Sequence, residues 1–324
     1  MQALQVQSLS PDFSGCALAT VPEPERKPGQ VVVRVRAVSL NYPDLLMTRG
    51  AYQLKPPLPF TPGMDVAGEV IAAKANSGFV PGDRVMGGAR LGGMAEIAAL
   101  DTHGVRPIPP QLDFAQAAAF GAAYHTAWVA LVELGQLQAA QWVLVHGASG
   151  GVGLAAADLA KALGARVIVT SGSAEKLAVV SREYASDAAI LSTGRFRDAV
   201  AEATGGALCD LVYDPVGGAV FDESTRCVAF GGKLLVVGFT SGRIADISTN
   251  IPLIKGFSIV GVRAGEWGRR FPERGRQADD QVHAMLAKGK LRPRVDRVLP
   301  LAEWKAAFTA MAGREMVGKI VLEP

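Results

Sequence analysis

Residues 142–187 combine a strand pattern, a glycine-rich turn and a helix pattern in one continuous stretch, an order that few folds accept. The apolar run Trp142–Val145 predicts a short buried strand, and Leu154–Leu163 predicts an alanine-rich amphipathic helix. Between them lies the sequence HGASGGVG, residues 146–153, and a second apolar run, Arg166–Thr170, follows the helix. This order of strand, glycine turn, helix and strand is typical of a βαβ unit that binds a dinucleotide.

The glycines of the turn have separable physical roles. Gly147, Gly150 and Gly151 let the backbone turn sharply and approach a ligand without an intervening Cβ, and Gly153 lets the helix lie close to the sheet. The first N–H groups of the helix have no acceptor within it, so a phosphate can bind there. We therefore expect a dinucleotide at this turn, the alternative being a tight loop without a ligand. The expected contacts are Ser149, Gly150, Gly151 and Val152.

The end of the second strand indicates which dinucleotide binds. Enzymes that use NAD usually carry an acidic residue there for the ribose 2′-hydroxyl. This chain has Ser171-Gly172-Ser173 instead, with Lys176 one turn into the next helix. Hydroxyls and an ammonium suit a 2′-phosphate, which a carboxylate would repel, so we expect NADPH. The alternative is that a serine only caps the helix and that Lys176 is a solvated surface residue.

The whole chain narrows the class of protein. Its 324 residues are enough for two domains, and a net charge of +3 gives no argument for nucleic acid. No secretory signal is visible at the N-terminus, and no stretch is long and apolar enough to span a membrane. Cys16, Cys209 and Cys227 are scattered singly, which fits neither a disulfide framework nor a metal site. We therefore expect a cytoplasmic protein that binds neither nucleic acid nor membrane.

The segments on either side of this unit differ in texture. Residues 1–122 contain many short strand candidates between Pro and Gly turns, which indicates a β-barrel-like domain. Residues 123–263 alternate strands and helices, which predicts a doubly wound parallel sheet of the Rossmann type. Residues 264–324 return to helix and strand, and we expect them to pack on the first domain. That domain would then be discontinuous, with the nucleotide domain inserted in it.

Several motifs resemble one family along nearly the entire chain. The glycine turn is accompanied by NYPD (41–44), PGMDVAG (62–68), PGDRV (81–85) and YDPVGG (213–218). In this order they are similar to the medium-chain dehydrogenase/reductase superfamily, in its zinc-free quinone oxidoreductase branch. The resemblance implies a GroES-like catalytic domain joined to a Rossmann domain, and NADPH-dependent reduction of quinones or α,β-unsaturated carbonyl compounds.

The residues themselves argue against a metal ion. Zinc-dependent relatives have Cys where this chain has Asn41 and Gly-His-Glu where it has Gly63-Met64-Asp65, and the four histidines here are isolated. Zinc needs three or four well-placed ligands, and none of these sets is present, so we expect no metal. Without a Lewis acid, the substrate has to be an electrophile that accepts hydride readily.

The resemblance assigns three catalytic candidates to the first domain. Asn41 and Asp44 match positions that line the nicotinamide cleft, where the Asn41 amide could bind the cofactor or a developing oxyanion. Its alternative role is that of a turn residue ahead of Pro43. Tyr52 matches a tyrosine that faces the substrate and either donates a proton or walls the cleft. Leu46 stands where relatives often have a second tyrosine, which favours protonation by water.

The resemblance also assigns further residues to the cofactor. Besides Asn41, these are Thr126, Phe239, Thr240, Arg263 and Lys319. The ordinary alternatives are a helix residue for Thr126, a core aromatic for Phe239 and a strand-flanking charge for Lys319. Arg195 could contact the 2′-phosphate, or it could be a solvated loop residue.

Two further features leave alternatives open. Residues 261–276 contain five arginines and could form a substrate-side loop for an acidic group, which would favour an enoyl-CoA or acrylyl-CoA thioester reductase. A solvated basic face is the commoner explanation for such a stretch, and a non-catalytic NADPH-binding redox sensor is the remaining alternative. The apolar strand candidate Ser258–Val262 is expected at the edge of the sheet, where it would pair with a second copy in a homodimer.

Overall fold

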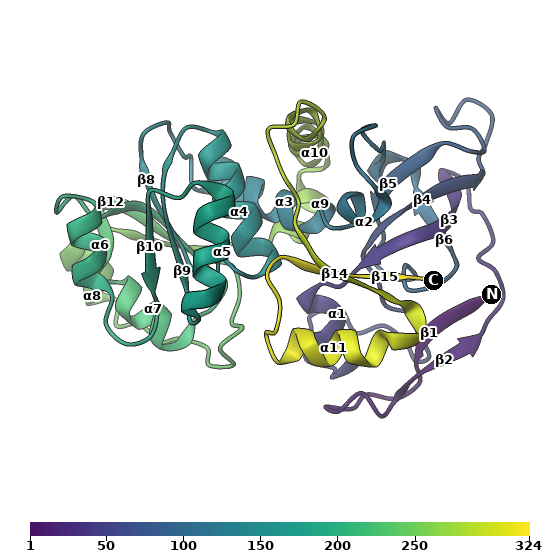
Figure 1. Ribbon diagram of the computed structural model, residues 1–324, viewed down its shortest axis with the longest axis horizontal. Helices are drawn as coiled ribbons and strands as arrows, with labels where there is room; N and C mark the ends of the chain where they lie inside the picture. The colour runs from purple at the N-terminus through teal and green to yellow at the C-terminus, as the bar shows by residue number, and fades with distance from the viewer. The chain divides into compact units, whose positions relative to one another are not determined.

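The glycine-rich segment lies in the middle of a six-stranded parallel sheet (Figure 1) in the computed structural model, which describes all 324 residues. The strands are, in spatial order, β10 (Ala188–Leu191), β9 (Arg166–Ser171), β8 (Trp142–Val145), β11 (Cys209–Asp214), β12 (Val228–Val236) and β13 (Ser258–Gly261). The chain runs outward from β8 to β10 and then returns to the other side of β8 with β11. The strand order therefore reverses between β8 and β11, and open parallel sheets usually bind ligands at the carboxyl ends of the strands at such a point.

Helices cover both faces of this sheet. They are α4 (Gly151–Ala162), α5 (Ala174–Tyr184), α6 (Arg197–Ala203), α7 (Gly218–Ser224) and α8 (Asn250–Lys255). Helices α4 and α5 pack on one face, and side chains of α6 and α7 join the buried cluster on the opposite face (Figure 1). Small alanine side chains bring α4 close to β8 and β9, and residues 153–160 of this helix are all buried. The expected doubly wound sheet is confirmed.

The second boundary between the two compact units differs from the prediction. One unit is Met1–Ala122 with Pro293–Pro324, and the other is Ala123–Arg292. The segment at 261–276, considered as a possible loop, is mostly helical, as α9 (Ala264–Arg270) followed by α10 (Pro272–Ala287). These helices pack on α3 (Gly121–Trp128) and the π-helix η2 (Val129–Leu134), where Asp279 lies 2.6 Å from His125 and Arg274 pairs with Glu133. Residues 264–292 therefore belong to the same compact unit as the six-stranded parallel sheet.

One carboxylate holds both ends of this unit. Asp158 of α4 is buried, and its Oδ2 accepts hydrogen bonds from the Tyr124 hydroxyl and from the backbone N–H of Arg292, each at 2.7 Å. The Tyr184 hydroxyl in turn donates to the carbonyl of Arg292. The two places where the chain enters and leaves the unit are therefore joined to the helix that follows the glycine turn.

The other unit contains a seven-stranded sheet that the C-terminal tail completes. Its strands are β14 (Val295–Pro300), β15 (Lys319–Glu323), β3 (Gln30–Ser39), β4 (Asp65–Ala72), β5 (Arg84–Gly88) and β7 (Val105–Pro107), with β6 (Ile97–Asp101) paired to β3. A small sheet is formed by β1 (Gln2–Val6) and β2 (Cys16–Thr20). Because β15 pairs antiparallel with β3, residues near position 320 lie beside residues near position 40.

Short helices close this unit. They are α1 (Tyr42–Thr48), η1 (Thr102–Gly104), α2 (Phe114–Ala118), η3 (Leu301–Glu303) and α11 (Trp304–Ala312). Helix α11 buries Phe308 against Phe13, with ring centroids 5.5 Å apart, so residues from both ends of the chain share one core. The Pro- and Gly-punctuated strands thus form the expected GroES-like domain.

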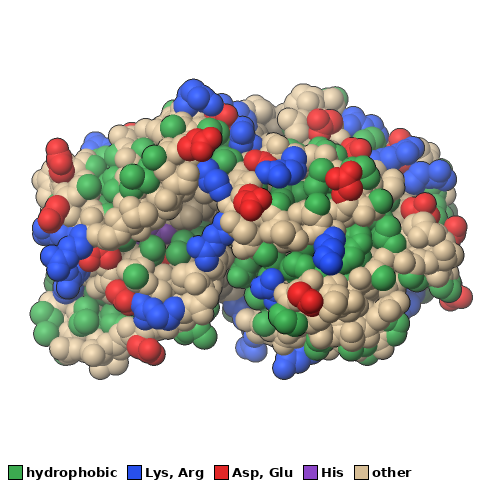
Figure 2. Space-filling view, turned by 60° about the horizontal axis from the view of Figure 1, so that its bottom comes forward, with side chains coloured by type: hydrophobic (Ala, Val, Ile, Leu, Met, Phe, Trp, Pro, Cys, Tyr) green, Lys and Arg blue, Asp and Glu red, His purple; other side chains and the backbone are tan.

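The remaining general expectations concern cysteines, charge and membranes. The three cysteines are unpaired and buried, and the cytoplasmic location inferred from them stays a prediction. Acidic and basic side chains are interspersed on the face in Figure 2 and do not form a patch of one sign. Among the helices, none combines the length and the apolar character needed to cross a bilayer.

Candidate functional site

The glycine turn has the backbone geometry that an anion site requires. Gly147 has a φ of +57°, and its carbonyl accepts from the N–H of Gly150 at 2.9 Å. Helix α4 begins at Gly151, and its N-cap residue Gly150 offers no side-chain hydrogen bond. The N–H groups of Gly151 and Val152 therefore keep their donor capacity for a ligand.

Gly153 is required for the shape of this turn. A Cβ on Gly153 would lie 2.3 Å from the carbonyl oxygen of Gly147 and 2.9 Å from that of His146. These are backbone atoms, so the turn itself would have to move to accept a side chain. The glycine-rich turn and the start of α4 are thus in direct contact at Gly153, with no room for a side chain.

The tip of β9 presents hydroxyl groups to the same region. The Oγ atoms of Ser149 and Ser171 are 3.3 Å apart, and the N–H of Ser173 donates to Ser171. Ser173 caps α5, because its Oγ accepts from the N–H of Lys176. The capping role considered for Ser173 is therefore present. Gly172 has open space around it, where a Cβ would meet no atom within 4 Å.

Two loops adjoin the tip of β9 and the end of β11. The N–H of Ser192 donates to the carbonyl of Ser171, which places the exposed loop containing Arg195 beside the strand tip. The N–H of Thr240 donates to the carbonyl of Pro215 and thereby ties the loop after β12 to the end of β11. Phe239 in this loop is 37% exposed, so it is not the core aromatic that the alternative suggested.

The Phe239 ring packs directly on the backbone of Gly217. A Cβ on Gly217, whose φ is +70°, would lie 2.8 Å from the Phe239 ring. Arg263 is exposed directly beyond β13, and its carbonyl accepts the first hydrogen bonds of α9. Thr126 lies on α3 and is half-buried. The structure thus brings Phe239 and Thr240 to the carboxyl end of β11, close to the glycine turn, where Gly147 faces Val216.

The first unit contains a buried polar cluster that joins distant parts of the chain. The ammonium of Lys319 donates to Oδ1 of Asn41 at 2.6 Å, and Nδ2 of Asn41 donates to Oδ2 of Asp65 at 3.0 Å. Asp65 also accepts from the N–H of Ala122 and lies 3.9 Å from the Lys319 ammonium. Lys319 is therefore an internal cation, which corrects its alternative role as a strand-flanking charge.

The arrangement changes what Asn41 and Asp44 can do. The Asn41 amide donates to Oδ2 of Asp65 at 3.0 Å and makes a longer contact of 3.5 Å with the carbonyl of Ser39, so both of its N–H donors are directed at protein atoms. Asp44 is buried, and its carboxylate accepts from the N–H groups of Asn41 and Gly63 at 2.9 Å each. Burial raises the pKa of Asp44 to about 6, although these hydrogen bonds and Lys319 act in the opposite direction. Asp44 therefore holds the start of α1 and the turn at Gly63.

Tyr52 differs from these two residues. Its ring is half-buried against the hydrophobic cluster of this unit, and its hydroxyl makes no hydrogen bond. Leu46 packs on the same cluster as an apolar residue. The Tyr52 hydroxyl is therefore available to a ligand, whereas the polar side-chain groups of Asn41 and Asp44 are bonded to protein atoms.

The arginines of 261–276, considered above as a possible substrate-side loop or as a solvated basic face, lie on and around α9 and the start of α10. Arg269 and Arg270 both pair with Glu266 on α9. Arg274 pairs with Glu133 and lies over the rings of Trp267 and Phe271. Helical spacing brings these charges onto acidic neighbours, which was hidden in the sequence by Gly265, Gly268 and Gly275. The feature that favoured a thioester substrate is thereby weakened.

Asp65 is the main residue that sequence reasoning missed. It was considered only as part of a replaced metal motif, yet it links Asn41, Lys319 and Ala122. A carboxylate at the head of the apolar run DVAGEV was the available signal, because such a group needs partners when buried. No three His, Cys, Asp or Glu side chains are grouped as metal ligands.

Comparisons with known proteins agree with this architecture. Residues 27–110 match the model of the alcohol dehydrogenase GroES-like domain, and residues 151–280 match that of the zinc-binding dehydrogenase family. The chain is 37% identical over 297 residues to the quinone oxidoreductase-like protein 2 homolog of Nematostella vectensis, covering 90% of this chain and 81% of that protein. It is 33% identical over 302 residues to the quinone oxidoreductase of Homo sapiens, covering 92% and 90%.

Solved structures give the same picture. The quinone oxidoreductase of Thermus thermophilus, which was also solved in complex with NADPH, superposes with a TM-score of 0.86 at 32% identity, covering 100% of both chains. A probable oxidoreductase from Mycobacterium abscessus superposes with a TM-score of 0.90 at 39% identity, covering 100% of this chain and 99% of that one.

Proposed function

Because the chain belongs to the quinone oxidoreductase branch of the medium-chain dehydrogenase/reductase superfamily, we propose that it transfers hydride from NADPH to a quinone or an α,β-unsaturated carbonyl compound without a metal ion. The observation that carries the proposal is the uncapped start of α4 beside a strand tip with serines and no carboxylate. A nicotinamide cofactor follows from the family and the Rossmann sheet, and the preference for NADPH rests on this strand tip.

The residues present fit the cofactor. Gly147 and Gly153 make a backbone cradle that a Cβ would fill, and the N–H groups of Gly151 and Val152 would bind the pyrophosphate. Ser171, Ser173 and Lys176 would hold the 2′-phosphate, and Gly172 leaves room for it. Once bound, the cofactor supplies the hydride, and the protein supplies orientation and a water-poor surrounding.

The buried cluster of the first unit supports metal-free chemistry. The Lys319 ammonium lies 2.6 Å from the Asn41 side chain and 3.9 Å from Asp65. The resemblance matches Asn41 to a Cys of zinc-dependent relatives, and Asp65 to the Glu of their Gly-His-Glu motif. Burial lowers the pKa of Lys319, while Asp65 and Asp44 act in the opposite direction, and in its charged form the ammonium repels a divalent cation at this distance. We propose that Asn41 and Asp44 hold the buried polar cluster in shape beneath the substrate. We propose that Tyr52, whose hydroxyl has no hydrogen-bond partner, faces the substrate. If Tyr52 only lines the site, water supplies the proton that the reduced substrate takes up.

A turnover assay tests the proposal. We expect the purified protein to oxidise NADPH in the presence of benzoquinone or phenanthrenequinone, followed by the loss of the absorbance of the reduced nicotinamide. The dissociation constant for NADPH should be at least about tenfold lower than for NADH, or about 1.4 kcal/mol, since only the 2′-phosphate makes charge-assisted bonds with the strand-tip hydroxyls and Lys176. A mixture without protein serves as the control for uncatalysed oxidation.

Other outcomes of that assay point to the alternatives. Turnover of crotonyl-CoA far above that of any quinone would identify a thioester reductase. Tight NADPH binding without turnover across a panel of electrophiles would identify a redox sensor. A many-fold preference for NADH, or a dependence of activity on stoichiometric zinc, would overturn the proposal itself.

We further propose a homodimer formed through β13. This strand is the last of the sheet, and its outer edge has no partner strand. Exposed apolar side chains lie around it, with Phe230 89% exposed at the start of β12 and Leu253 and Ile254 80% and 75% exposed on α8. An open edge next to such a surface favours a symmetric partner.

The substitution Ile259→Lys should convert this dimer to a monomer. Ile259 is exposed on β13, and a lysine there would place like charges opposite each other across the two-fold axis. Leu9→Lys, at an exposed leucine of the other unit, is the matched control. Sedimentation at micromolar concentration measures both, and a wild-type monomer would contradict the prediction.

A further inference from the structure

His146 is a fully buried histidine between β8 and the glycine turn, and nothing above gives it a role. Its backbone N–H donates to the carbonyl of Tyr213 on β11. Its Nδ1 lies 2.8 Å from Oγ1 of Thr170 on β9, and its Nε2 lies 2.7 Å from Oγ of Ser224 on α7. One imidazole ring therefore connects the sheet strand before the turn, the neighbouring strand and a helix on the sheet.

The hydrogen bonds of the neighbours determine the tautomer of this ring. Ser224 Oγ donates to the carbonyl of Val220 at 2.6 Å, so it has to accept from His146, and Nε2 carries the proton. Nδ1 is then a bare acceptor, and Thr170 donates its hydroxyl proton to it. Burial lowers the pKa of His146 to about 3, so the ring is neutral at physiological pH.

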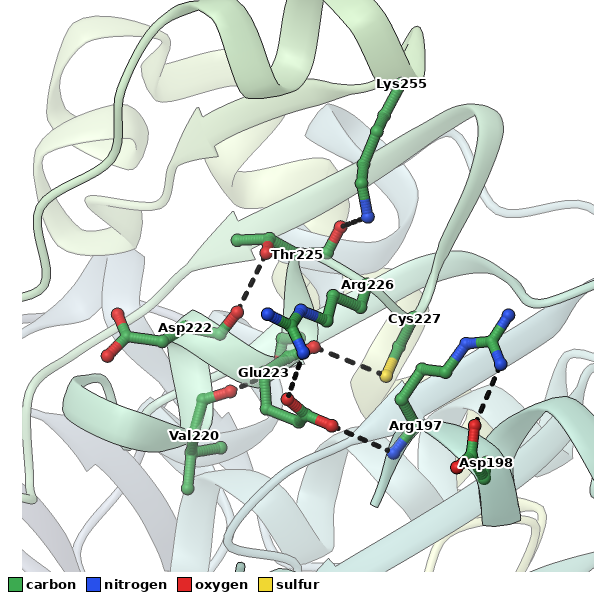
Figure 3. Close-up of polar contacts among 10 residues, drawn as sticks. Arg197, Asp198, Val220, Asp222, Glu223, Thr225, Arg226, Cys227 and Lys255 are labelled. Atoms are coloured by element: carbon green, nitrogen blue, oxygen red, sulfur yellow. Dashed lines mark hydrogen bonds and ion pairs between the residues drawn. The ribbon is translucent and has the colours of Figure 1, made fainter. Parts of the chain in front are cut away.

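Ser224 is itself held in place, which makes it a rigid anchor for the ring. Figure 3 shows the contacts around the last turn of α7. The N–H of Arg197 donates to the carboxylate of Glu223, and the ammonium of Lys255 donates to the carbonyl of Thr225. Helix α6 and the end of α8 thus fix the residues on both sides of Ser224 in the sequence.

The other end of the network reaches the cofactor side. Thr170 directly precedes Ser171, whose hydroxyl meets that of Ser149 in the turn. The carbonyl of Thr170 accepts from the N–H of Ala148 at 3.0 Å, so Thr170 contacts the turn through its backbone and His146 through its side chain. The ring of His146 also packs on Phe196, next to Arg195, with centroids 5.2 Å apart.

We propose that His146 is a positioning residue that holds the tip of β9 at a set distance from the glycine turn and thereby determines the preference for the 2′-phosphate. The inference rests on the proposed function, because it deepens the assignment of NADPH. The pyrophosphate binds to the turn and the 2′-phosphate to the strand tip, so both phosphates are held together only when these two segments keep their spacing. NADH places only a neutral ribose 2′-hydroxyl at the strand tip, so its affinity depends less on this spacing.

The experiment compares the cofactor affinities of three variants. Thr170→Val removes the hydroxyl that His146 holds, and His146→Phe removes both hydrogen bonds while keeping a ring. Tyr213→Phe is the matched control, because the buried Tyr213 hydroxyl on β11 has no hydrogen-bond partner. Fluorescence titration gives the dissociation constants for NADPH and NADH, thermal unfolding reports folding, and steady-state kinetics separate KM from kcat.

Thr170→Val and His146→Phe should each raise the dissociation constant for NADPH about tenfold, a loss of about 1.4 kcal/mol, while that for NADH changes less than about twofold. KM for NADPH should follow, with kcat at saturating NADPH retained, and Tyr213→Phe should resemble the wild type. If His146→Phe does not fold, Thr170→Val decides alone.

Two results would overturn the inference. An equal rise in the dissociation constants for NADPH and NADH would show that His146 contributes only to packing. Unchanged dissociation constants in a folded Thr170→Val variant would show that His146 does not position the tip of β9. A wild type that binds NADH as tightly as NADPH would instead refute the proposed cofactor, and the inference with it.

Discussion

Replacing Gly153 with alanine is expected to weaken NADPH binding at least about 100-fold, which corresponds to about 2.7 kcal/mol. The new Cβ would lie 2.3 Å from the Gly147 carbonyl oxygen and 2.7 Å from its carbonyl carbon. Neither atom can rotate away as a side chain would, so the turn has to move off the start of α4. That movement displaces the N–H groups of Gly151 and Val152 from the pyrophosphate. Fluorescence titration with NADPH measures the effect.

A second glycine provides the control for this substitution. Gly104 of η1 is exposed in the other unit, and a Cβ there would meet no atom within 4 Å. Gly104→Ala should therefore keep the wild-type affinity and melting temperature. NADPH binding by a folded Gly153→Ala protein at wild-type strength would show that the turn does not hold the pyrophosphate.

Replacing Lys319 with methionine is expected to cost about 3–5 kcal/mol of stability, because it leaves buried carboxylates without their cation. Lys319 is 5% exposed, Asp65 4% and Asp44 0%, so water cannot take over the role of the ammonium. The change also removes the donor that satisfies Oδ1 of Asn41. Thermal unfolding should show a decrease of roughly 10 °C in the melting temperature.

Two further variants separate charge from packing. Lys305→Met, at an exposed lysine of α11, should leave the melting temperature within about 2 °C of the wild type, as surface changes usually do. Adding Asp65→Asn to Lys319→Met should recover part of the loss, because it removes an unpaired buried charge. A Lys319→Met protein no less stable than Lys305→Met would contradict the role of the cluster.

The loss in Lys319→Met should also depend on pH. The pKa of Asp44 is raised from 3.8 to about 6, so the folded protein binds more protons than the unfolded chain between these values. The contribution of this group to stability therefore grows as the pH falls through that window and is lost as the pH rises through about 6. Without Lys319 the carboxylate is still less favourable, so the deficit of the variant should be smaller at pH 5 than at pH 8.

Local patterns in the sequence were sufficient for much of the fold. The run at 142–145, the glycine turn and the run at 166–170 became β8, the start of α4 and β9. The spacing of apolar residues and the positions of the glycines lie within about ten residues of each other. A short window of sequence is therefore enough to predict these elements. A helix was predicted over Asp279–Lys288, but the helical residues 264–278 before it were missed, because glycines and arginines obscured a pattern that is stabilised by packing on α3 and η2.

The sequence by itself determined the two domain types, the position of the turn and the absence of an acid at the tip of β9. Only the tertiary structure decided which polar side chains act together, since Lys319 and Asn41 are 278 positions apart and His146 and Ser224 are 78 apart. The physical reason is that a buried polar group takes whichever partner the fold brings within about 3 Å, and no local pattern records that partner.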